Sequence, residues 1–192
     1  LSDSSRSRFK FADKFKNLKI VKIKNLPKQS QFLGSEFLFK GNFWKYTSQR
    51  FEVLFDFVEK NNINKFFHAE IDNLLFNFDE LDCRLDNIGN GIFVPRDSID
   101  RGIASFIYCN KMSCLKDILK MYLPYKNACN DMDALGHYAK ENKNFYSLPT
   151  ESFVQNAKLW DVINPNSCQG IFDAAAIGQY CLGIDPNNNR YN

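Results

Sequence analysis

The sequence has few of the residues that build zinc sites and disulfide frameworks. It contains only two histidines, and none of its six cysteines belongs to a Cys-x-x-Cys pair. This usage argues against a zinc cage. Several cysteines lie in apolar segments, where a buried free thiol is ordinary, so we expect most of them to be reduced and no bridge between Cys109 and Cys114. The same reasoning favours a reducing compartment, and we predict a cytoplasmic protein.

The sequence also lacks a long apolar run, a signal peptide and a strong net charge. No segment is long and apolar enough to span a bilayer. A formal net charge of +3 is too small to indicate a nucleic-acid partner. Basic residues cluster near the start of the sequence. A cluster of this kind is typical either of a solvated face or of peripheral contact with an anionic membrane. Its members are Arg6, Arg8, Lys10, Lys14, Lys16, Lys19, Lys22 and Lys24.

What the sequence does contain is a hydrophobic share of 44% in a length that fits one core. We therefore predict a single domain over residues 1–192, in which residues 1–17 form a basic, flexible N-terminal segment. Alternating helices and strands indicate an α/β fold with a mixed, mainly parallel sheet and helices on both faces. Hydrophobic periodicity predicts helices at 43–60, 113–122 and 170–180, a helix that begins at 130–133, strands at 19–23, 65–69, 92–94 and 103–108, an extended piece at 145–149 and a surface segment at 76–85.

The most informative stretch is Lys65–Asn73, in which an apolar run leads directly into two carboxylates and an amide. A buried strand that ends in this way places Glu70 and Asp72 at the carboxyl edge of a sheet, where open α/β folds bind ligands. Two carboxylates held so close repel each other unless a cation lies between them, and Mg²⁺ or Mn²⁺ takes oxygen ligands of this kind. The alternative is that both are turn residues that close the strand, since Asp and Asn are common turn formers.

Two segments together resemble a known family. Residues 44–73 have the form W-x-x-T-x-x-R-F, a helix, a short strand, and then H-x-E-x-D-N. This block is similar to the GT-A type of nucleotide-sugar-dependent glycosyltransferases, in which a DXD-like motif ends a strand and holds a divalent cation; here the motif is Glu70-Ile71-Asp72. The later segments Phe172–Tyr180 and Gly183–Pro186 resemble a C-terminal signature of uncharacterised bacterial and viral members of this group. The resemblance covers roughly residues 40–186.

The resemblance implies a metal-dependent enzyme with a GT-A-like core. That core would be incomplete, because the first nucleotide-binding strand and helix of the family do not precede the basic segment. Asp72 would bind Mn²⁺ or Mg²⁺ directly, and Glu70 would bind the same ion through water or hold a ribose hydroxyl. The cation would neutralise the charge that develops on the departing nucleoside diphosphate. The family's late histidine ligand has no clear equivalent, since His137 lies in a predicted helix and is expected to be structural.

Arg50, Asn73 and His68 each have a structural interpretation beside the functional one. Arg50 would pair with the donor phosphates as a bidentate donor, or it would form a surface salt bridge. Asn73 would support the site or serve only as a turn amide. His68 faces the same side of the strand as Glu70 if the alternation holds, and we expect it to be buried and hydrogen-bonded.

Asp131, Asp133 and Asp173 are the candidate catalytic acids. Each lies at the start of a predicted helix, where unpaired amides and the helix dipole stabilise a carboxylate. That explanation is sufficient without any catalytic role. A general base for the acceptor hydroxyl is also expected in a late loop that opens a helix, if the enzyme inverts the anomeric configuration.

These observations predict a glycosyltransferase that moves a sugar from a nucleotide-sugar donor to a hydroxyl of a glycan or other acceptor. Two other classes remain open. A non-catalytic carbohydrate-recognition or interaction domain would keep the fold without donor binding, and an aromatic content of 15% suits stacking on sugar rings. A metal-dependent phosphohydrolase would also use paired carboxylates, together with further Asp or His ligands late in the chain.

Overall fold

The computed structural model describes residues 17, 21, 43–70, 73, 78–121 and 130–174. Several predictions fall wholly or largely outside this part of the chain. They concern the basic segment 1–17, the strand at 19–23, the metal ligand Asp72 and residues 175–186 of the C-terminal signature.

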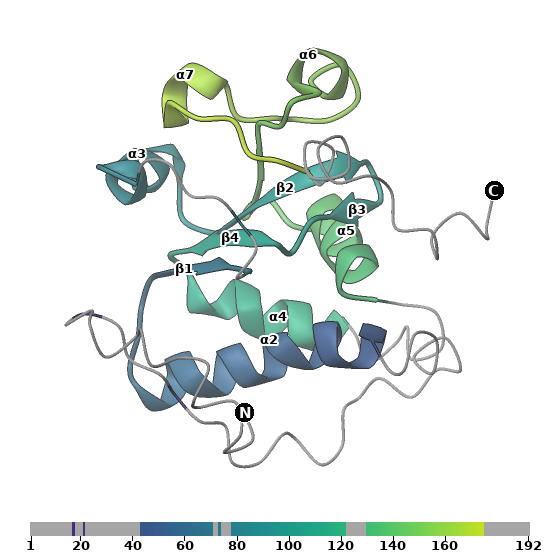
Figure 1. Cartoon of the computed structure of the whole chain (residues 1–192). Coiled ribbons are helices and arrows are strands. Elements are labelled where there is room, and N and C mark those ends of the chain that lie inside the picture. Colours follow the sequence, from purple (N-terminus) through teal and green to yellow (C-terminus); the bar gives the residue numbers. More distant parts are fainter. Residues whose placement is uncertain are drawn as a thin grey trace.

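The described strands form one five-stranded sheet (Figure 1). Its members are β1 (Phe66–Ala69), β2 (Ile92–Ser98), β3 (Arg101–Gly102), β4 (Phe106–Cys109) and β5 (Phe145–Leu148). β4 lies between β1 and β2 and is antiparallel to both, and β3 pairs antiparallel with the end of β2. Only β5 is parallel to its partner, β2. The sheet is therefore mixed and mostly antiparallel, and the prediction of a mainly parallel sheet is wrong.

A tight return of the chain after β2 explains the antiparallel pairing. The chain turns at residues 99–100, and β3 and β4 then run back along β2. Of the strand predicted at 103–108, only residues 106–108 are in β4, and residues 104–105 form a turn between β3 and β4. Because β1 and β2 are both antiparallel to β4, and β5 is parallel to β2, the strands β1, β2 and β5 all point the same way. Their carboxyl ends therefore share one edge of the sheet.

Helices lie on both faces of this sheet, as predicted. α2 (Phe43–Lys60), α4 (Met112–Met121) and α5 (Asp131–Glu141) contribute to the core on one face, and α3 (Leu81–Ile88) and α7 (Pro165–Cys168) to the core on the other. Figure 1 shows α2 and α4 below the sheet and α3 and α7 above it. The strands alternate accordingly, with Ile92 and Ile107 in the first core and Phe93 and Tyr108 in the second. The short helix α6 (Phe153–Asn156) follows β5.

α2 has the bounds that the sequence predicts, 43–60. Its apolar stripe explains why it forms, since Phe51 and Val58 are buried in the first core and Leu54 and Phe55 are partly buried beside them. The helix ends where expected, and Asn62 adopts a left-handed conformation with φ of 52°.

Two local predictions differ from the structure. The sequence predicts a buried strand at 65–69, but β1 is at one end of the described sheet and its residues are half-buried. An apolar run indicates that a strand is buried, but it does not indicate whether the strand lies inside the sheet or at its edge. The segment 76–85 was expected on the surface, yet it leads into α3, where Leu81 and Leu85 are buried one helical turn apart.

Candidate active site

Three candidate residues from three different elements meet at the carboxyl end of β1. Arg50 lies on α2, Glu70 directly follows β1, and Asp131 is the first residue of α5. The Arg50 guanidinium donates from Nη1 to Glu70 Oε1 and from Nη2 to Asp131 Oδ2, and it forms an ion pair with each carboxylate. The fold thus joins a predicted donor-binding residue, a predicted metal ligand and a predicted catalytic acid in one cluster.

This cluster is open to solvent at Glu70 and closed at Asp131. The side chains of Glu70, Arg50 and Asp131 are 37%, 21% and 1% exposed. Burial of the Arg50 guanidinium opposes its charge, but the carboxylates of Asp131 and Glu70 outweigh this effect and raise the Arg50 pKa above its ordinary value. One formal positive charge faces two negative ones. The cluster therefore keeps one net negative charge, which favours cations and hydroxyl groups over phosphates at this point.

His68 precedes Glu70 by two residues and lies beside the same guanidinium. Burial, and next the charge of Arg50, lower the pKa of His68 to about 4. The imidazole is therefore neutral at pH 7. Its Nε2 atom is buried without a hydrogen-bond partner. The His68 side chain is half-buried, like the rest of β1, and the predicted hydrogen bond is not found at Nε2.

Two further atoms of the cluster are buried without a partner, Arg50 Nε and Asp131 Oδ1. Buried polar atoms are nearly always hydrogen-bonded in native proteins. Leaving one without a partner costs roughly 1–3 kcal/mol. Three such atoms in one cluster make it the candidate site, because unsatisfied groups in native proteins call for an explanation.

Asn73 is hydrogen-bonded to both Glu70 and Ser105. Its side-chain amide donates to the Ser105 carbonyl, which also accepts the Glu70 N–H at 2.9 Å. The Asn73 N–H in turn donates to the Glu70 carbonyl at 3.1 Å. Asn73 therefore acts as a turn amide, and through Ser105 it ties the carboxyl end of β1 to the segment that enters β4.

Asp133 is part of the cap of α5. Its N–H donates to Asn130 Oδ1 at 2.9 Å, so Asn130 is the N-cap of α5, within the range where the sequence predicts the helix to begin. Burial raises the pKa of the Asp133 carboxyl, and a hydrogen bond from the Asn130 backbone opposes that rise. The paired contacts between positions N-cap and N3 resemble a capping box. They account for Asp133 without a catalytic role.

The start of the C-terminal signature returns to the same edge of the sheet. The Phe172 N–H donates to the Pro149 carbonyl at 2.8 Å, just beyond the carboxyl end of β5. The Phe172 ring centroid lies 4.9 Å from that of Phe106, which pairs with Ala69 at the end of β1. Asp173 is exposed here and is not itself helical, and most of the helix predicted after it lies outside the described residues. The first described residues of the C-terminal signature therefore lie near the end of β1.

A second polar group at this edge was missed by the sequence analysis. Arg96, near the end of β2, is only 5% exposed. Its guanidinium donates to the Ser147 hydroxyl at 3.3 Å and to the Ile99 carbonyl, and it lies 4.9 Å from the centroid of the Trp160 ring. The sequence pattern could have indicated this group, since Arg96 and Asp97 follow an apolar run just as Glu70 follows β1.

The first cluster has the donor chemistry of a divalent-cation site. Glu70 and Asp131 supply carboxylate oxygens, Asp131 Oδ1 has no hydrogen-bond partner, and one negative charge remains beside Arg50. Within the described residues, no three His, Cys, Asp or Glu side chains gather closely enough to hold a metal ion. The further ligand that the resemblance implies, Asp72, lies outside them.

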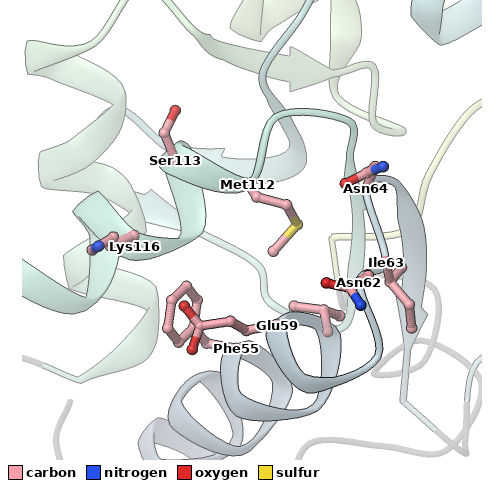
Figure 2. A pocket seen from close by; sticks show the side chains of 9 residues that line it. Phe55, Glu59, Asn62, Ile63, Asn64, Met112, Ser113 and Lys116 are labelled. Carbon is pink, nitrogen blue, oxygen red and sulfur yellow. The ribbon is translucent and has the colours of Figure 1, made fainter.

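A cavity of about 270 Å³ lies at the opposite end of β1. It is formed by the end of α2, the chain that enters β1 and the start of α4. Figure 2 shows Met112 pointing into it from α4, while Phe55 and Glu59 face it from α2. No candidate site residue lines this cavity, so it is separate from the cluster around Arg50. Its lining residues are Phe55, Val58, Glu59, Asn62, Ile63, Asn64, Met112, Ser113 and Lys116.

Comparisons of the chain with protein-family models, with curated proteins and with solved structures give no match. Across the described ranges, no helix is both long and apolar enough to cross a membrane. Cys109 and Cys114 are both free thiols, as are Cys83 and Cys168, in agreement with the prediction that no bridge joins the first two.

Proposed function

We propose that this protein is a glycosyltransferase with a GT-A-like core. It would transfer a sugar from a nucleotide-sugar donor to a hydroxyl of a glycan or other acceptor, with Mn²⁺ or Mg²⁺. The observation that carries the proposal is the group of residues at the end of β1. Arg50 joins Glu70 to Asp131, and Phe172 packs against Phe106, which pairs with the residue before Glu70. The carboxyl edge shared by β1, β2 and β5 is where open α/β sheets bind ligands.

Asp72 and Glu70 are the residues that would hold the cation. When bound, the cation supplies Lewis-acid neutralisation of the departing diphosphate. Arg50 restricts the Glu70 carboxylate through its contact with the buried Asp131. Asn73 restricts the backbone at the same point by its bond to the Ser105 carbonyl. Groups that are already held in place reorganise less when negative charge develops on the leaving group.

Exposure distinguishes the three candidate acids. Asp131 is 1% exposed and paired with Arg50, so it suits a positioning role. Asp133 is engaged in the cap of α5. Asp173 is exposed at the carboxyl edge, and it is the acid that an acceptor hydroxyl would reach. We therefore assign Asp173 as the general base for the acceptor.

The test is a donor screen with matched variants. Purified protein is incubated with a panel of uridine and guanosine diphosphate sugars, with and without Mn²⁺, and release of nucleoside diphosphate is followed. Wild type should hydrolyse or transfer at least one donor only when Mn²⁺ is present. Asp173→Asn should lower turnover by on the order of 10²-fold while donor affinity is kept. Asp133→Asn is the matched control, and its turnover should stay within a few-fold of wild type.

Each rival class gives a different result in the same screen. Release of inorganic phosphate from simple esters, without donor turnover, would identify a metal-dependent phosphohydrolase. Binding of glycans without turnover of any donor would identify a carbohydrate-recognition domain. Either outcome would replace the proposed function.

A further inference from the structure

We propose that Glu151 is a positioning residue for Asp173, the acid assigned above as the general base. Glu151 fixes the backbone that carries Asp173 and thereby restricts where its carboxylate can lie. The inference rests on the proposed function, because it concerns how the proposed base is held. The contacts that support it lie among residues 149–156 and 172–174, just beyond the carboxyl end of β5.

The chain is held on both sides of Asp173. On one side, the Phe172 N–H donates to the Pro149 carbonyl at 2.8 Å. On the other side, the Ala174 N–H donates to Glu151 Oε2 at 3.2 Å. The first contact is made by backbone atoms alone. The second depends on one side chain, so a substitution of Glu151 isolates its effect.

The Ala174 N–H needs this acceptor. Ala174 is 7% exposed, although Asp173 before it is exposed. A buried backbone N–H is almost always hydrogen-bonded in native proteins. The exposed carboxylate of Glu151 supplies the bond, and a charged acceptor makes it stronger than a bond between neutral groups. Because both neighbours of Asp173 are bonded, its backbone cannot turn the side chain away from the exposed side without breaking one of the two bonds.

The segment that carries Glu151 is itself anchored in the protein. Thr150 is 2% exposed, it forms a parallel bridge with Phe172, and its Oγ1 accepts from Asn156 Nδ2 at 3.1 Å. Asn156, in α6, is also buried. The Phe153 N–H donates to the Thr150 carbonyl at 3.0 Å where α6 begins. Two buried polar side chains therefore hold the backbone next to Glu151, and its carboxylate acts from a fixed base.

This arrangement matters for a general base because such a group acts only within hydrogen-bond reach of the proton that it removes. A misplacement of about 1 Å can lower a rate by on the order of 10²-fold. Loss of the Glu151 side chain keeps the Asp173 carboxylate but releases the backbone after it. The loss should therefore lower turnover and leave donor binding largely unchanged.

Steady-state kinetics on a donor identified in the screen separates the hydrogen bond of Glu151 from its charge. Glutamine keeps an acceptor oxygen and removes the charge, whereas alanine removes both. We expect Glu151→Ala to lower kcat by about tenfold or more and to leave the donor KM within about twofold, while Glu151→Gln stays within about threefold of wild type. Glu141→Ala, at the exposed glutamate that ends α5, is the matched control and should behave as wild type. Equal losses of kcat in the two Glu151 variants, or a loss confined to KM, would overturn the inference.

A double-mutant cycle tests whether Glu151 acts through Asp173. In Asp173→Asn the base is already absent, so adding Glu151→Ala should lower kcat by less than about twofold further. A merely structural role of Glu151 predicts the same factor with and without the base, and that result would refute the positioning role.

Amide hydrogen exchange, followed by NMR, tests the contact without any turnover. The Ala174 N–H should be protected in wild type and in Glu151→Gln, and it should exchange about tenfold or more faster in Glu151→Ala, while the amides of β5 are unchanged. Equal exchange at Ala174 in wild type and Glu151→Ala would contradict the inference even if donor turnover is found. A wild-type protein that turns over no donor would refute the proposed function, and the exchange rates would still decide whether Glu151 holds residues 172–174.

Discussion

Replacing Arg50 by methionine should destabilise the protein by about 3–5 kcal/mol, because it leaves the Asp131 carboxylate buried without a cation. The magnitude follows from the unequal burial of the two partners of Arg50. Asp131 is 1% exposed and cannot be solvated in place. Glu70 is 37% exposed, so its pair with Arg50 is screened by solvent and Glu70→Gln should cost less than about 1 kcal/mol. The double variant Arg50→Met with Asp131→Leu should recover much of the loss.

Urea unfolding of these variants measures the free energy of unfolding by linear extrapolation, with the slope as a check on two-state behaviour. Lys60→Met is a matched control on the same helix, since Lys60 pairs at 3.4 Å with Asp56 at an exposed position. It should change stability by no more than about 0.5 kcal/mol. Equal costs for Arg50→Met and Glu70→Gln, or a cost below about 1 kcal/mol for Arg50→Met, would refute the assignment of Asp131 as the buried anchor.

Two more predictions concern His68 and the packing of α5. The pKa of His68 is about 4 in the folded protein and about 6.5 when unfolded, so the unfolded chain binds the extra proton first. Stability should therefore fall by on the order of 3 kcal/mol between pH 7 and pH 4, and His68→Gln should flatten this part of the profile measured by urea unfolding. A Cβ at Gly136 would lie 1.7 Å from the Asp100 carbonyl oxygen, whereas one at Gly170 would meet nothing closer than 3.8 Å. Gly136→Ala should therefore cost about 1–3 kcal/mol or more in thermal or urea unfolding, and a cost no greater than that of Gly170→Ala would contradict the close packing of α5 on β3.

The elements that were predicted well are those that local sequence determines. α2 follows from one apolar stripe and the two asparagines after it, and the N-cap of α5 follows from Asn130 and its bond to Asp133. β5 at Phe145–Leu148 agrees with the extended piece predicted there. In each case the determining groups lie within a few residues of one another.

The features that were missed depend on contacts between distant segments. The direction of β4 is set by the return of β3 and β4 along β2, and the hydrophobic pattern within β4 does not indicate that direction. Arg50 and Asp131 are 81 residues apart in the sequence. The sequence could therefore suggest each residue as a candidate, but not the contact between them. The lack of a partner at His68 Nε2 is likewise visible only in three dimensions. Candidate residue types were thus predictable, whereas their arrangement was not.

The most direct test of the central claim is calorimetric titration with Mn²⁺ and a nucleoside diphosphate on wild type, Asp72→Asn and Asp56→Asn. Asn keeps the shape of Asp72 and removes its charge, so folding should change little. We predict that wild type and the exposed control Asp56→Asn bind the nucleotide in a Mn²⁺-dependent way, while Asp72→Asn binds it much more weakly and loses turnover by on the order of 10²-fold. Equal Mn²⁺-dependent affinity in wild type and Asp72→Asn would contradict the account, because Asp72 would then be only a turn residue.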